Sequence, residues 1–212
     1  EICACLVGSE MCIRDSAHSV IKTVNQVSTR AVPVTRIEEG DPYLGIKTKA
    51  EITITSGGVY STYLRKQPLI IVEGFDPREL SKKDGNGKGA TDAESFNNML
   101  REAERGMGSL FGGVITSNYD IVYIDWMDSG ELLQSNSNTL QKAIQYVNQL
   151  KANAGITAPN IIYGHSMGGV IARHALRTME NRGIRHNTSH YISHDAPHLG
   201  ANVPLGALYA VY

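Results

Sequence analysis

The chain has 212 residues, 42% of them apolar and 19% charged, with a formal net charge of −1 at pH 7. This length is sufficient for one domain with a sizeable core, and the composition excludes a fibre, a disordered chain and a disulfide scaffold. The near-neutral charge gives no electrostatic reason to expect nucleic acid as a partner. No run approaches the roughly 18 uncharged apolar residues of a membrane span.

Residues 1–16, EICACLVGSEMCIRDS, show no periodicity and no capping pattern. They resemble the translated adaptor sequence found at the ends of some environmental gene fragments, so we expect an artefact and exclude them from the fold prediction. The alternative is a short secretory apolar segment, which Glu10, Arg14 and Asp15 fit poorly. All three cysteines lie in this stretch, so cysteine usage indicates nothing about redox compartment.

An extended, β-rich pattern covers residues 17–65. Ile52 and Ile54 alternate with threonines, a Gly-Gly pair supplies a turn, and residues 59–64 have the pattern of a returning strand. This region is predicted to form antiparallel strands, either as a small β domain or as the leading strands of a mixed sheet.

From residue 66 onwards, short apolar runs alternate with longer amphipathic segments. Runs typical of strands buried on both faces occur at residues 69–72, 121–124 and 161–163, and a weaker one at 191–193.

Two amphipathic helices are predicted between these runs, since apolar residues recur at three- and four-residue steps over 140–150 and 170–179. Ser137 or Asn138 is the expected cap of the first helix, and Gly155 its end. Helical crossovers of this length join parallel strands. The predicted fold class is therefore α/β, a mostly parallel sheet flanked by helices and preceded by the β-rich region.

The polar, glycine-rich stretch at 81–92 partly matches a calcium-binding loop through Asp84 and Asn86. Lys88 stands at the fifth position and Ser95 at the twelfth, where oxygen ligands and a bidentate glutamate are required. We expect a surface loop and no metal site.

Residues 164–169, GHSMGG, directly follow one predicted strand and precede a predicted helix. A serine at such a turn takes a strained conformation that exposes its hydroxyl, and Gly164 and Gly168 let neighbouring backbone pass close. The helix that begins at Met167 directs free N–H groups towards the place where negative charge develops. The motif predicts Ser166 as nucleophile and the Met167 N–H as an oxyanion donor.

The segment VEGFDP, residues 72–77, follows the first buried strand and is the candidate source of a second donor. Gly74 permits a tight turn, which leaves the Phe75 N–H as the expected donor. Each donor of this kind contributes about 3 kcal/mol to transition-state stabilisation. The alternative is a plain exit from strand to loop, since this segment is less diagnostic than GHSMGG.

These segments carry a family resemblance. GHSMGG resembles the nucleophile elbow of α/β-hydrolase lipases and esterases, and VEGFDP is similar to their oxyanion loop, with Glu73 where histidine is usual. DAPHLG at 195–200 resembles the PH-x-G segment of many bacterial lipases. With YDIVYIDWMDSG, the set looks most like secreted or surface-attached hydrolases of Bacteroidetes-type bacteria. The resemblance covers residues 68–212 and implies a partial α/β-hydrolase domain, no cofactor and a small-molecule or lipid ester as substrate.

The fold's chain order places an acid and then a histidine after the serine. Only 46 residues follow Ser166, so we expect a truncated, inactive fragment whose catalytic histidine lies beyond Tyr212. Asp195 is the candidate acid, while Asp125 and Asp128 are expected to hold loop geometry.

Two histidines near the candidate site are expected to have structural roles. His198 is only three residues from the candidate acid, which makes a shared triad awkward, so it is expected to brace its loop. His165 is expected to pack beside the nucleophile. His186, His190 and His194 lack a carboxylate or cysteine to complete a zinc site.

The predicted function is hydrolysis of carboxylic esters through an acyl-enzyme on Ser166. Two same-fold alternatives are an acyltransferase and a peptidase, because a fold does not determine the acceptor or leaving group. A third alternative is a non-catalytic surface module that kept the fold without its triad.

Overall fold

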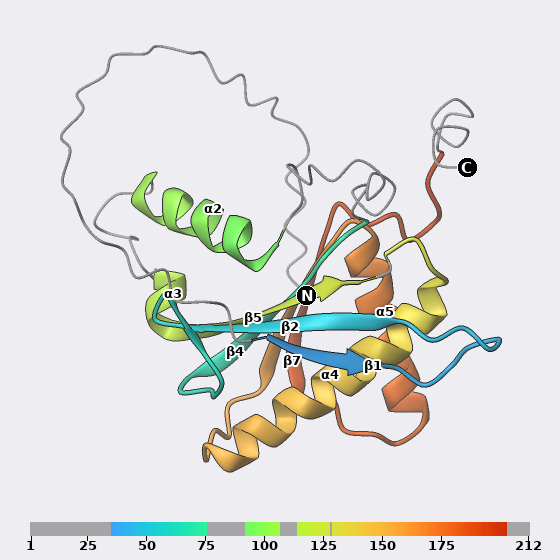
Figure 1. The fold of residues 1–212 in the computed structure, drawn as a ribbon, viewed down its shortest axis with the longest axis horizontal. Coiled ribbons are helices and arrows are strands. Elements are labelled where there is room, and N and C mark those ends of the chain that lie inside the picture. Colours follow the sequence, from blue (N-terminus) through green and yellow to red (C-terminus); the bar gives the residue numbers. More distant parts are fainter. Residues whose placement is uncertain (1–34, 76–91, 107–113, 128, 203–212) are drawn as a thin grey trace, which may run out of the picture. The chain divides into compact units, whose positions relative to one another are not determined.

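The computed structural model describes residues 35–75, 92–106, 114–127 and 129–202, which belong to one unit, Ala31–Tyr212. Residues 1–16, most of the polar loop at 81–92 and Asp128 lie outside the described part. Along the chain, the described elements are β1 (Thr35–Glu39), β2 (Lys49–Ser56), β3 (Val59–Ser61), β4 (Gln67–Val72), α2 (Ala93–Gly106), α3 (Val114–Asn118), β5 (Tyr119–Trp126), α4 (Leu133–Asn153), β6 (Asn160–His165), α5 (Met167–Asn181) and β7 (Thr188–His194) (Figure 1).

The strands form one mixed, seven-stranded sheet in the order β1-β2-β5-β4-β6-β7, with β3 paired to β2. The β5-β4-β6-β7 part is parallel, as the alternation of strands and helices predicts. The β-rich region supplies the leading strands of this sheet, because β2 pairs antiparallel with β5. Its turn lies at Gly57 and Gly58, whose positive φ values of 58° and 81° suit a tight hairpin.

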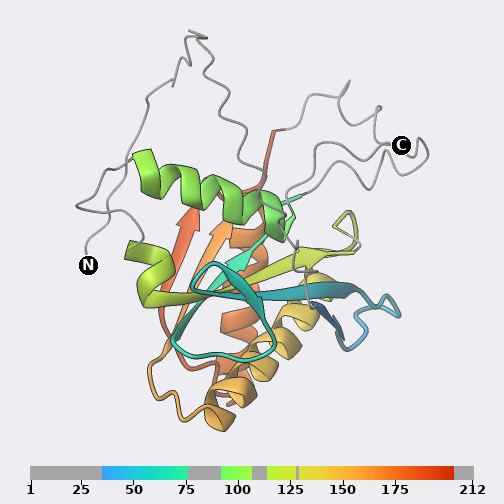
Figure 2. The ribbon, with the colours of Figure 1, turned by 60° about the vertical axis from the view of Figure 1, so that its left-hand side comes forward.

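Helices cover both faces of the sheet (Figure 2). On one face α4 and α5 pack over a core that includes Ile70, Val72 and Ile124. On the other face α2 and α3 pack over a smaller cluster that includes Ile71 and Tyr123. Because successive side chains of a strand point to opposite faces, both faces of β4 require apolar residues, which explains its uninterrupted apolar sequence.

The start of α4 differs from the prediction. The helix begins at Leu133 and has no side-chain cap, so Ser137 and Asn138 are not its cap. The Ser137 hydroxyl bonds instead to His174 Nδ1 of α5 at 2.8 Å, while Thr139 Oγ1 donates to the carbonyl of Thr48 at 2.9 Å. Ser137, one of the two predicted caps, therefore connects α4 to α5 instead.

The helix ends follow the expected glycine chemistry. Gly155 follows α4 with a φ of 68°, and Gly183 follows α5 with the same value. Among the described residues, no helix has both the length and the apolar character needed to cross a membrane.

The strand order reverses at β4, and a crevice is expected at the carboxyl end of the sheet at this point. The chain runs from β4 through α2 and α3 on one face to β5, and later returns through α4 on the other face to β6, on the opposite side of β4. Loops that leave neighbouring parallel strands towards opposite faces open a crevice at their carboxyl ends. Val72 pairs with both Ile124 and Gly164, and Gly164 with Ser193, so the four strand ends form one row.

We predict that Ile144→Ala lowers the free energy of unfolding by about 2–5 kcal/mol, because Ile144 is fully buried between α4 and the sheet. Gln145→Ala, on the exposed side of the same helix, is the control, with an expected change within about 0.5 kcal/mol. Urea unfolding followed by circular dichroism measures both. Equal losses would show that α4 does not pack on the sheet as described.

Candidate active site

Ser166 lies at the turn between β6 and α5 with a φ of 51° and a ψ of −127°. A non-glycine residue in such a conformation costs on the order of 1–3 kcal/mol, which the surrounding structure must supply. Two backbone hydrogen bonds hold the turn: the Ser166 N–H donates to the His194 carbonyl at 2.9 Å, and the Gly169 N–H donates to the Ser166 carbonyl at 3.0 Å. Within the described residues, the Ser166 hydroxyl makes no cap hydrogen bond to α5.

Close contacts explain the glycines of the GHSMGG motif. A Cβ on Gly164 would lie 2.5 Å from the Cα of Gly169, and one on Gly168 would lie 2.2 Å from the Glu73 carbonyl oxygen. A Cβ on Gly74 would lie 3.2 Å from the Cβ of Ser166. The loop after β4 therefore crosses directly against the serine turn.

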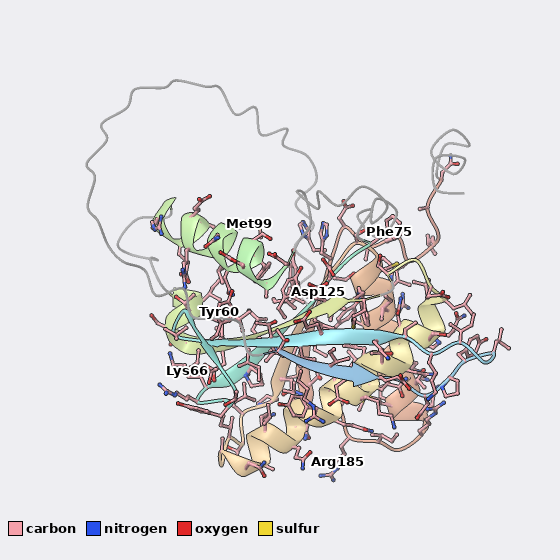
Figure 3. All side chains as sticks on the ribbon, in the orientation of Figure 1. Tyr60, Lys66, Phe75, Met99, Asp125 and Arg185 are labelled. Carbon is pink, nitrogen blue, oxygen red and sulfur yellow. The ribbon has the colours of Figure 1, made fainter. Side chains whose placement is uncertain are left out.

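Both expected oxyanion donors border the same cavity. Met167 opens α5, and Phe75 follows β4 with 41% of its surface exposed (Figure 3). They line a cavity of about 350 Å³ whose wall also includes the apolar side chains of Leu133, Val170 and Pro197. The positive end of α5 faces this side of the sheet, so the site favours developing negative charge.

Glu73, which precedes this loop, is buried and bonded to β5. Its N–H donates to the Ile124 carbonyl at 3.3 Å, and its carbonyl accepts the indole N–H of Trp126 at 2.9 Å. Its carboxylate accepts the Tyr123 hydroxyl at 3.3 Å and the Trp126 backbone N–H at 3.2 Å. The sequence pattern predicted no role for Glu73, although an acidic residue directly after a buried apolar strand is a signal for one.

The environment of Tyr123 matches this arrangement. Burial, followed by the charges of Glu73 and Asp125, raises the pKa of the Tyr123 phenol. The phenol therefore stays protonated and acts as a donor at neutral pH. Asp125 lies at the end of β5, where a role in loop geometry was expected (Figure 3).

The segment after β7 carries the candidate acid. Asp195 directly follows β7, is exposed and has a positive φ of 49°. His198 Nε2 lies 2.7 Å from Ser193 Oγ, and the His198 N–H donates to the Ala196 carbonyl at 2.9 Å. His198 thus braces this loop. The described contacts bring neither Asp195 nor His198 into a hydrogen bond with Ser166.

A small aromatic cluster lies beside the nucleophile turn. The Tyr163 hydroxyl lies 2.5 Å from His194 Nδ1, and the rings of His165 and His194 are 5.4 Å apart. Burial raises the pKa of the Tyr163 phenol. His165 is exposed and contacts another imidazole.

His186 and His190 contact neighbouring groups. His186 Nδ1 accepts the Thr188 N–H at 3.1 Å, and His190 Nδ1 lies 2.9 Å from Ser189 Oγ. In the part of the chain that is described, no three His, Cys, Asp or Glu side chains are placed to hold a metal ion.

Residues 118–212 match the family described as the PGAP1-like alpha/beta domain. No curated protein matches the chain. Its fold is similar to the iron-lacking apo form of ESTFA (14% identity, TM-score 0.46, 86% of this chain and 52% of that one). It is also similar to an epoxide hydrolase from Vigna radiata (11% identity, TM-score 0.42, 85% of this chain and 46% of that one). A third similar structure is an esterase from Pyrobaculum calidifontis (14% identity, TM-score 0.41, 75% of this chain and 44% of that one). The chain spans about half the length of these proteins.

We predict that Gly168→Ala lowers the free energy of unfolding by about 1–3 kcal/mol, because the new Cβ would overlap backbone oxygens of the β4 loop. Gly130→Ala is the control, since a Cβ there meets nothing within 4 Å and its φ is not positive. Chemical denaturation measures both variants. A Gly168→Ala protein as stable as the control would contradict the close approach of loop and elbow.

Proposed function

We propose that the protein is a serine hydrolase that cleaves carboxylic esters through an acyl-enzyme on Ser166. The observation that carries this proposal is the backbone of Ser166, a non-glycine residue with a φ of 51° at a strand-to-helix turn. Such strain concentrates at functional sites, and a plain helix start does not need it. The turn lies at the strand-order reversal, where open α/β sheets bind their ligands.

The proposed reaction begins with attack of Ser166 Oγ on the ester carbonyl carbon while a base removes the hydroxyl proton. The N–H groups of Met167 and Phe75 stabilise the oxyanion of the tetrahedral intermediate. The carbonyl re-forms, the alcohol leaves with the proton, and water then hydrolyses the acyl-enzyme by the same steps. The proposed base is a histidine, and Asp195 is the candidate acid.

The cavity beside the two donor residues supports a small or medium-sized apolar substrate group. Its volume of about 350 Å³ is near the lower end of the range for ligand pockets. Leu133 and Val170 supply apolar wall, and Ser129 and Glu131 supply polar groups on the side of the β5–α4 connection. An ester has this combination of an apolar chain and a polar reacting centre.

A fluorophosphonate probe tests the nucleophile in the full-length protein. The serine oxygen would bond to phosphorus as fluoride leaves, so we expect stoichiometric labelling that Ser166→Ala abolishes. Ser189→Ala, on the exposed part of β7, should label as the wild type does. Labelling that persists in Ser166→Ala, or none in the wild type, refutes the proposal and favours a non-catalytic module.

Paired substrates test the reaction class. We expect kcat/KM for p-nitrophenyl esters to exceed that for matched aminoacyl-anilides by at least about 100-fold, because p-nitrophenolate leaves without taking up a proton whereas an amine must be protonated to leave. Faster anilide cleavage indicates a peptidase. Ester consumption that depends on an added alcohol acceptor indicates an acyltransferase.

A further inference from the structure

Glu73 is held to β5 at four points, by both its backbone and its side chain. The N–H donates to Ile124, the carbonyl accepts the Trp126 indole N–H, and the carboxylate accepts the Tyr123 hydroxyl and the Trp126 backbone N–H. Only 5% of the residue is exposed. A glutamate is rarely buried to this degree without a compensating set of donors. The donors on β5 therefore form a specific binding site for this side chain.

The backbone of Glu73 also packs directly against the serine turn. Its carbonyl oxygen lies 2.2 Å from the place that a Cβ on Gly168 would occupy, and the next residue, Gly74, passes against Ser166. Phe75 follows directly. A displacement of Glu73 along β5 therefore moves the Phe75 backbone relative to the Met167 backbone.

The direction of the carboxylate also matters for charge. A buried anion near an oxyanion site would oppose the negative charge of the transition state. Here both carboxylate oxygens accept hydrogen bonds from β5, from Tyr123 and Trp126. The Glu73 carboxylate thus anchors the loop after β4 to β5, which supplies both hydrogen-bond donors.

We propose that Glu73 is a positioning residue that sets the Phe75 N–H at the correct distance from the Met167 N–H for binding an oxyanion. This inference rests on the proposed serine hydrolase function. A misplacement of about 1 Å at a reacting centre can reduce the rate by roughly 100-fold, so a residue that fixes the loop controls turnover without touching the substrate.

The decisive variant is Glu73→Gln in the full-length protein. The amide keeps the shape but offers only one acceptor oxygen for two donors. When that oxygen accepts the Trp126 N–H, the amide N–H groups face the Tyr123 hydroxyl, which can then no longer donate to residue 73. We expect kcat to fall roughly 10- to 100-fold with KM within about twofold, because the loss appears in the transition state. The inhibition constant of an alkylboronic acid, which forms a tetrahedral adduct on the serine, should rise by about the factor by which kcat/KM falls.

Glu104→Gln is the matched control. Glu104 is 4% exposed, and its carboxylate accepts the N–H groups of Ile115 and Thr116 and the Thr116 hydroxyl, between α2 and α3. It should lose comparable stability and keep kcat and boronate affinity. An equal fall of kcat in both variants would reduce the role of Glu73 to general stability and overturn the inference.

Tyr123→Phe keeps the proposal falsifiable if Glu73→Gln does not fold. It removes one donor to the carboxylate and preserves the ring, so we expect a smaller fall in kcat, about 3- to 10-fold, with KM unchanged. Unchanged kcat and boronate affinity in Tyr123→Phe or in folded Glu73→Gln overturn the role of Glu73. If the wild type is not labelled at Ser166, the proposed function itself fails, which is a separate result.

Discussion

The site depends on one close approach between two backbone segments. The loop that leaves β4 passes so near the first turn of α5 that any side chain at Gly168 would overlap the carbonyl oxygens of Val72 and Glu73. Val72 and Gly164 are also neighbours in the sheet, so the two segments are already adjacent before they diverge. Close packing of backbone on backbone places Phe75, Ser166 and Met167 at the same sheet edge.

The rest of the fold maintains this approach. The parallel strands β5, β4, β6 and β7 end in one row, which gives their loops a common edge. The antiparallel strands on the other side of β5 widen the sheet and give α4 more surface to cover. Ser135 and Thr139 of α4 donate hydrogen bonds to backbone carbonyls just before β2, so side-chain bonds tie α4 to the antiparallel part of the sheet.

The sequence predicted the elements whose physical signals are local. The apolar run at residues 69–72 and the GHSMGG turn were recognisable because burial and tight turns each demand a narrow set of residue types. The cap of α4 was predicted wrongly, since Ser137 serves a contact with His174 that no local pattern shows. The anchoring of Glu73 was missed for the same reason: its partners lie about fifty residues away, on β5.

The two faces of the sheet differ in how much apolar surface they bury. Among the described residues, the α4–α5 face buries nineteen clustered apolar side chains and the α2–α3 face four. Local opening needs less free energy where fewer apolar contacts break. Amide hydrogens of α2 should therefore exchange with solvent sooner than those of α4 and α5. The part of the fold that carries Ser166 would then be rigid, while α2 on the opposite face of the sheet would unfold locally more often.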